Sequence, residues 1–176
     1  MTQTRHRLIG SLLLCISCTC AVPGLGQVSS PEDAATVKRV MTTVLARCYS
    51  KTNGITKIAF EPPRDQDVAE IKALGDRAIP PIAAYLDLEQ KDGFTQLFAV
   101  KFLMAIGGPG TFASLQRASA EDQWEITRAA ALAGMFAVSK TRAKPFVETA
   151  LADKSELVRR RAQALWDLYR EHEESK

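Results

Sequence analysis

The sequence predicts an all-α fold, built as a short stack of antiparallel helix pairs with one extra helix at its N-terminal end. Three observations support this prediction. Apolar residues recur at helical spacing along most of the chain after position 30. Glycine and proline divide that pattern into short units. A proline also precedes a leucine by six residues at three places, Pro80/Leu86, Pro109/Leu115 and Pro145/Leu151.

Residues 1–26 have the pattern of a secretory signal peptide. Arg5 and Arg7 form a basic start, and an uncharged run follows over 8–22. Small residues for a cleavage site then stand at Gly24 to Gly26. The uncharged run has 15 residues, whereas a membrane-spanning helix needs about 20. We therefore expect an exported protein, periplasmic or secreted, that is cleaved after this segment.

Two other uses of the first segment stay open. Cys18 follows Ile16 and Ser17, which is a partial match to the lipidation motif of bacterial lipoproteins. A lipid chain at Cys18 would tether the protein to a membrane surface. An uncleaved signal would also hold the protein at the membrane. We expect membrane contact only in one of these two cases.

Removal of the signal changes how charge and cysteine content are interpreted. The segment 1–26 contains two arginines and no acid, so the rest of the chain has 21 Lys/Arg against 20 Asp/Glu. A chain so close to neutral has no general attraction for phosphate backbones, and we expect no nucleic acid among its partners. Cys48 is the one cysteine that remains. Its place on an apolar helix face predicts a buried side chain, and an intermolecular disulfide is the alternative.

The segment 27–63 is predicted to form one helix and a linker. Ser30 and Asp33 have the spacing of a capping box, which predicts a helix over 31–49. Asn-Gly and Pro-Pro pairs then interrupt the helical pattern. Between these pairs, residues 55–60 are predicted to form a short extended piece.

The segment 64–176 is predicted to contain the helix pairs. Longer helices are expected at 64–75, 94–106 and 122–138, and after each of them a proline is expected to open a shorter helix. These prolines are separated by 29 and 36 residues. Repeats of this length indicate helix pairs that bury their apolar faces against each other. Prolines that open helices in an ordinary bundle are the alternative.

Three segments resemble HEAT repeats. The segment 75–86 is similar to the turn and second helix of such a repeat, 157–165 is similar to a first helix, and 127–134 is a looser copy of a first helix. The resemblance covers about residues 64–170. It implies an α-solenoid whose second helices line a concave binding face.

The resemblance also implies roles for individual residues. Arg128 and Arg161 lie in first helices, where HEAT repeats often have an arginine that binds an acid of the neighbouring repeat. Residues between the core positions of the second helices would face a partner. Our candidates for partner binding are Tyr85, Asp87, Arg117, Lys144 and Glu148.

The sequence offers little for catalysis. His172 is the one histidine after residue 26, so nucleophile systems that need a histidine base lack a well-placed one. One cysteine and one histidine do not make a typical zinc site, and the glycine motifs that bind phosphate do not occur. We expect no catalytic residues, no metal and no cofactor.

The function expected from the sequence is that of a scaffold or interaction module that binds a protein or peptide in the cell envelope. The alternative is a helper or lyase-like enzyme that holds a substrate in the concave groove. A third possibility is a structural role through self-association.

Overall fold

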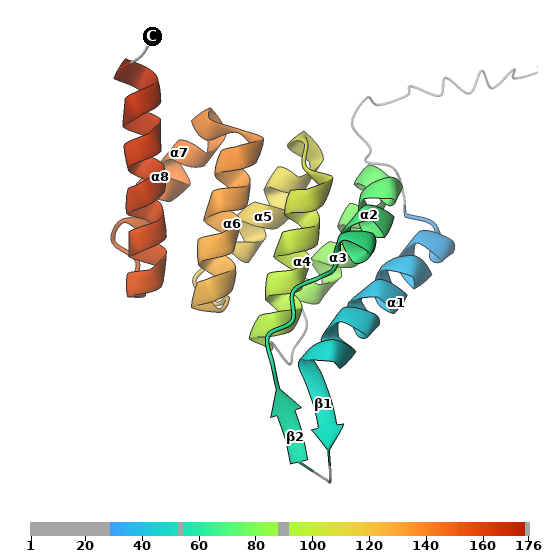
Figure 1. The fold of residues 1–176 in the computed structure, drawn as a ribbon. Helices are drawn as coiled ribbons and strands as arrows, with labels where there is room; N and C mark the ends of the chain where they lie inside the picture. Colours follow the sequence, from blue (N-terminus) through green and yellow to red (C-terminus); the bar gives the residue numbers. More distant parts are fainter. Residues whose placement is uncertain (1–28, 53–54, 88–91, 175–176) are drawn as a thin grey trace, which may run out of the picture.

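The computed structural model describes residues 29–52, 55–87 and 92–174, which form an α-helical fold with one β-hairpin (Figure 1). The predicted helical class is therefore confirmed. The predicted signal peptide and the Cys18 alternative lie outside the described residues. None of the described helices combines the length and the apolar character that crossing a membrane requires.

The first helix, α1 (Pro31–Cys48), begins as its capping pattern predicts. The Oγ of Ser30 accepts a hydrogen bond from the backbone N–H of Asp33, and the Asp33 carboxylate accepts one from the N–H of Ser30, each at 3.1 Å. The apolar face of the helix is fully buried, including the Cys48 side chain. The buried position predicted for Cys48 is confirmed.

The predicted linker is partly a β-hairpin. The strands β1 (Tyr49–Thr52) and β2 (Ile55–Ile58) pair antiparallel, with Tyr49 opposite Ile58. The extended piece predicted from residue 55 onward is confirmed as β2. Strand β1 was not predicted, because the apolar spacing of α1 continues up to residue 49 and strand pairing is not visible in a local pattern.

The first two helix pairs form where glycine and proline predict them. Each pair has a longer helix that ends at a glycine with positive φ, Gly75 at 57° and Gly107 at 67°. Each shorter segment includes a proline near its start. The elements are α2 (Asp65–Leu74), η1 (Gly75–Ala78), α3 (Ile79–Ala83) and η2 (Ala84–Leu86), followed by α4 (Gly93–Ile106), η3 (Pro109–Thr111) and α5 (Phe112–Ala118).

The third proline does not open a helix, and this prediction was wrong. After α6 (Glu125–Val138), the helix α7 (Lys140–Ala150) begins behind Ser139, whose Oγ accepts from the N–H of Arg142 at 3.4 Å. Pro145 lies inside α7 and forfeits one backbone hydrogen bond there. The serine cap sets the start of α7, and the buried Ala143, Val147 and Ala150 pack it on the core.

The helices follow one another along the molecule in sequence order, from α1 at one end to α8 (Glu156–Glu174) at the other (Figure 1). The helix α6 packs against α4, α5, α7 and α8, and α4 packs against α1, α2 and α3. One continuous core of buried apolar side chains extends from α1 to α8.

The segment 59–64 passes from β2 to α2 across the face of α4 (Figure 1). The Phe60 ring lies 5.8 Å from the ring of Phe94 and 6.0 Å from that of Phe98, both on α4. The N–H of Ala59 donates to the carbonyl oxygen of Cys48 at 3.0 Å. This segment thereby covers Phe94 and Phe98 of α4.

Gly134 allows α6 to approach α4 and α5 closely. A Cβ at this position would lie 2.8 Å from Cγ of Met104 and 3.0 Å from Cδ2 of Leu115. We expect Gly134→Val to lower the free energy of unfolding by about 1–3 kcal/mol through overpacking, measured by urea denaturation. Ala137→Val is the matched control, because Ala137 is exposed on the same helix. Equal losses for both variants would contradict this account of Gly134.

Candidate functional site

The structure brings together two of the five candidate binding residues. The Arg117 Nε donates to Asp87 Oδ1 at 3.0 Å, which links the end of η2 to α5. The same guanidinium binds both oxygens of Asp122, at 2.9 and 3.2 Å. All three side chains are at least 40% exposed, so we expect these ion pairs to contribute little stability.

The other three candidates lie in separate surroundings. Tyr85 is half-buried against the core, and this burial raises the pKa of its hydroxyl. The Lys144 ammonium lies 5.7 Å from the ring centroid of Trp166 and 4.9 Å from that of Tyr169, which joins α7 to α8. Glu148 is exposed on α7. A shared role for the five residues in binding stays a prediction.

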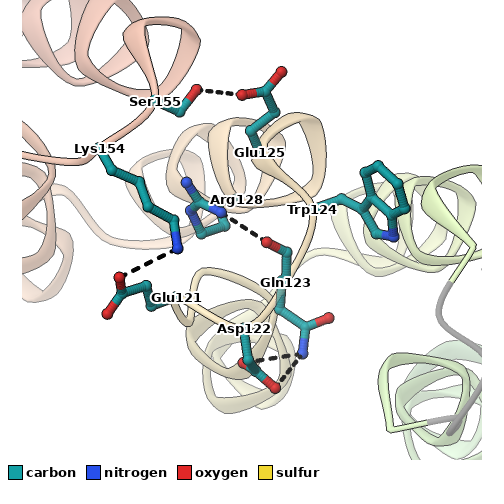
Figure 2. Close-up of a pocket in the computed structure, with 8 residues that line it drawn as sticks. All are labelled: Glu121, Asp122, Gln123, Trp124, Glu125, Arg128, Lys154 and Ser155. Carbon is teal, nitrogen blue, oxygen red and sulfur yellow. Dashed lines mark hydrogen bonds and ion pairs between the residues drawn. The ribbon is translucent and has the colours of Figure 1, made fainter.

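A second group of residues surrounds Trp124, which lines two pockets. The first, called here the Trp124 pocket, has a volume of about 380 Å³, and its described lining residues are Tyr49, Asp92, Gly93, Phe94, Leu97, Trp124 and Ile126. The second, called here the charged pocket, has a volume of about 660 Å³ (Figure 2). Its described lining residues are Glu121, Asp122, Gln123, Trp124, Glu125, Arg128, Lys154 and Ser155.

The indole of Trp124 is held between α6 and α4. Trp124 is the N-cap residue of α6 and has an extended backbone. Its backbone N–H donates to Oε1 of the buried Gln96 at 3.5 Å. Figure 2 shows its side chain pointing away from Arg128. The ring lies against the start of α4, because a Cβ built on Gly93 would be in van der Waals contact with the indole at 3.4 Å.

Two large apolar side chains at this site are exposed. Trp124 is 52% exposed and Ile126 is 43% exposed, although both lie at the start of a well-packed helix. From the sequence, Trp124 was predicted only to begin a helix, and no binding role was predicted for it. One signal was present: at an N-cap position a side chain usually bonds to the first turn, and tryptophan has no acceptor to do so.

Asp92 forms the polar wall of the Trp124 pocket. Its Oδ1 accepts from the N–H of Phe94 at 2.9 Å, from the N–H of Thr95 at 3.3 Å and from the Tyr49 hydroxyl at 2.8 Å. The Thr95 hydroxyl donates to the other oxygen. Burial raises the pKa of Asp92, but these hydrogen bonds outweigh it and hold the pKa below its usual value.

The facing phenol stays protonated. Burial raises the pKa of Tyr49 to about 12, and the hydrogen bond to Asp92 adds to this effect. The Tyr49 ring also meets the Phe94 ring edge-on, with 5.9 Å between centroids. At neutral pH the Trp124 pocket therefore has a phenol that donates a hydrogen bond, a carboxylate that accepts it, and apolar walls.

The charged pocket is built around the buried Arg128. Its Nη2 and Nε bind the two oxygens of Asp153 at 2.7 and 3.1 Å, and its Nη1 donates to the carbonyl oxygen of Gln123 at 2.7 Å. Asp153 also accepts from the N–H of Ser155 at 2.7 Å, and the Ser155 hydroxyl bonds to Glu125 at 2.7 Å. These bonds join α6 to the connection between α7 and α8.

The expected pairing of Arg128 with an acid near the next helix is confirmed. Arg161 is exposed instead. The residue that repeats Arg128 is Arg159, whose Nη1 donates to the carbonyl oxygens of Asp153 and Lys154 at 2.7 and 3.0 Å. Arg128 is the fourth residue of α6, and Arg159 is the fourth residue of α8.

Asp153 makes the fold sensitive to acid. Burial raises the pKa of Asp153, but hydrogen bonds from Arg128 and from the N–H of Ser155, with the charge of Arg128, lower it below the ordinary 3.8. A lowered pKa in the folded state gives stability that is present above the unfolded pKa and is lost as the pH falls through the folded value.

We therefore expect the urea midpoint to fall as the pH drops below about 4. It should fall less steeply in Arg128→Met, which lacks the guanidinium that lowers the pKa of Asp153. Urea titrations of both proteins between neutral and about pH 3 measure this. An identical pH dependence for the two proteins would contradict the assignment to Asp153.

Among the described residues, no group of three or more His, Cys, Asp or Glu side chains is arranged to hold a metal ion. In comparisons with known proteins, no family model, no curated protein and no solved structure matches the chain.

Proposed function

We propose that this chain is a short α-solenoid of HEAT-like helix pairs that binds a protein or peptide partner and has no catalytic activity of its own. A repeated register supports the solenoid. Asp92, Trp124 and Ser155 immediately precede α4, α6 and α8, at spacings of 32 and 31 residues. This spacing is more regular than that of the prolines, and repeats of similar length are typical of helix-pair solenoids.

The outer side of α8 supports the same architecture. The helix α6 buries Ala129, Leu132 and Phe136. The residues that follow these by 31 positions are Arg160, Gln163 and Asp167 on α8, and they are exposed or half-buried. Arg160 is paired with Glu156, and Gln163 donates to Asp167 at 2.9 Å. A polar outer face of this kind is typical of a terminal repeat in a stack.

The observation that supports binding most strongly is the exposure of Trp124 and Ile126 beside an apolar pocket on a rigid scaffold. Tryptophan is enriched among the residues that contribute most to binding energy at interfaces. Exposed apolar side chains grouped around a pocket also favour an interaction site. This surface lies at the starts of α4 and α6, whereas the candidates from the sequence lie at or near the second helices.

The charged groups of the two pockets favour binding over catalysis. A catalytic carboxylate pair needs two close carboxylates in an environment that shifts their pKa values apart. Asp92 is the one carboxylate among the described residues of the Trp124 pocket, and it is bonded to Tyr49. In the charged pocket, Glu121 pairs with Lys154 and Asp122 with Arg117. The alternative of a lyase-like helper lacks a comparable supporting observation.

We propose that the partner lies in the cell envelope or outside the cell, because the first residues have the pattern of a signal peptide. Membrane attachment enters the proposal only through lipidation at Cys18 or an uncleaved signal.

Site-specific photo-crosslinking tests the proposed function. A photoreactive amino acid replaces Ile126, and the control places it at Arg160, which is equally at the surface but on the polar side of α8. We expect a discrete protein adduct from position 126 that is lost in the Trp124→Ala background and is absent from position 160. Identical adducts from both positions, or none from position 126 in cells that express the full chain, would overturn the proposal.

A further inference from the structure

Among its described lining residues, the Trp124 pocket combines aromatic walls with one charged side chain, the half-buried Asp92. Tyr49, Phe94 and Trp124 supply the aromatic groups, and Leu97 and Ile126 complete the apolar lining. We propose that this pocket binds an organic cation, meaning an ammonium or guanidinium group joined to an apolar body. This inference rests on the proposed function and specifies the chemistry that the site recognises.

The charge of the pocket is negative. Asp92 is the only charged side chain among the described residues that line it. Its carboxylate is stabilised by hydrogen bonds from Tyr49, Phe94 and Thr95, and no ion pair of Asp92 is among the bonds of the described residues. The N–H groups at the start of α4 would attract an anion, but those of Phe94 and Thr95 are already bound by Asp92.

The aromatic groups favour a cation for a second reason. The face of an aromatic ring is electron-rich and attracts cations, most strongly for tryptophan, and the attraction grows when the cation leaves water. A wholly apolar ligand would gain from the same walls, but it would displace water from the half-buried Asp92 carboxylate without supplying a positive charge to it, and only the hydrogen bonds from Tyr49, Phe94 and Thr95 would remain. A cation with an apolar body satisfies both parts of the pocket.

The surroundings of the pocket repel anions. On the other side of Trp124, three of the charged residues lining the charged pocket are acidic, Glu121, Asp122 and Glu125, and two are basic, Arg128 and Lys154. The positive charge of Arg128 is paired with Asp153, and the negative charge of Asp122 is paired with Arg117, both outside this set. Together with Asp92, the described lining residues of both pockets contain four acids and two bases. This excess raises the local concentration of cations.

The proposed ligand chemistry has two possible sources. One is a lysine or arginine side chain of the protein partner. The other is a free quaternary amine. Both place a positive group near Asp92 and the aromatic rings, and they differ in whether an N–H donor is present. A pair of probes separates them.

Isothermal titration calorimetry on the full chain provides the test. The probes are choline, N-acetyl-lysinamide, N-acetyl-argininamide and the neutral choline analogue 3,3-dimethyl-1-butanol. Asp92→Asn removes the charge but keeps the helix cap, because asparagine caps as well as aspartate. Glu171→Gln is the matched control, since it removes one exposed carboxylate from α8. A thermal melt of each variant confirms that it is folded.

We expect saturable binding of at least one cation and none of the neutral analogue. Asp92→Asn should weaken binding of the cation by about tenfold, and Glu171→Gln should leave the binding unchanged. Binding of choline alone would assign the site to free amines, and binding of the amino-acid amides alone would assign it to a partner side chain. No saturable binding of any cation, or equal binding of the neutral analogue, would overturn the proposal.

Failure of this test is distinguishable from failure of the proposed function. If the adduct at position 126 depends on Trp124 while no cation binds, the chain is a binding module with a different ligand chemistry. If cations bind in an Asp92-dependent way while no adduct forms, the pocket binds small cations and the protein-binding function fails.

Discussion

Replacing Arg128 with methionine is expected to lower the free energy of unfolding by about 3 kcal/mol, because it leaves the largely buried Asp153 carboxylate without its cationic partner. The Arg128 side chain is 4% exposed and that of Asp153 is 15% exposed. The change also removes the hydrogen bond to the carbonyl oxygen of Gln123. Urea denaturation with linear extrapolation measures the loss.

Arg159→Met is the matched control for this prediction. Arg159 is exposed and donates to the backbone carbonyl oxygens of Asp153 and Lys154, so the same substitution there should cost only about 0.5 kcal/mol. Adding Asp153→Asn to Arg128→Met should cost little more, because the two residues form one pair. Equal losses at Arg128 and Arg159 would contradict the structural role assigned to the buried pair.

Replacing Trp124 with alanine is expected to weaken binding of the cross-linked partner by about 2 kcal/mol or more, which is roughly 30-fold in Kd. The exposed indole supplies the largest apolar area of the site, and its loss also opens the wall between the two pockets. Calorimetry or surface plasmon resonance with the purified partner measures the change.

Two controls accompany the Trp124 variant. Trp166→Phe changes the other tryptophan, which stacks on Tyr169 at the far end of the molecule, and should leave Kd unchanged. The free energy of unfolding of Trp124→Ala should stay within about 1 kcal/mol of the parent, because the side chain is half exposed. An unchanged Kd in Trp124→Ala would remove this surface from the proposal.

Local patterns were sufficient to predict much of the fold. The capping box at Ser30 and Asp33 and the glycines that end helices at Gly75 and Gly107 act within a few residues, and the helix start and both helix ends were predicted correctly. Pro145 was misassigned because proline at a helix start and proline inside a helix look alike in sequence. The cap at Ser139 and the packing of α7 decide between them. The strand β1 was missed because its pairing with β2 is not a local pattern.

The candidate site was much less predictable. Its parts come from α4, α6 and the residue after α1, and Tyr49 and Asp92 are 43 positions apart although their side chains are hydrogen-bonded. The pairing of Arg128 was foreseen from the resemblance, but Arg159, at the equivalent position of α8, was not. The placement of Trp124 depends on contacts between the start of α6 and α4, such as the hydrogen bond from its backbone N–H to Gln96, which no single-helix pattern contains.

The residues inferred from the sequence and those that line the Trp124 pocket belong to different elements. Tyr85 and Asp87 lie in or directly after η2, Arg117 lies in α5, and Lys144 and Glu148 lie in α7, whereas the Trp124 pocket lies at the starts of α4 and α6. A partner that binds one surface therefore protects different backbone amides from one that binds the other.

Hydrogen exchange of the chain with and without its cross-linked partner tests the central claim most directly. We expect added protection in the segments 92–98 and 124–130, which contain the walls of the Trp124 pocket, and little change in 82–87, 112–118 and 140–150. Protection confined to the latter three segments would contradict the Trp124 surface and favour the second helices as the binding face.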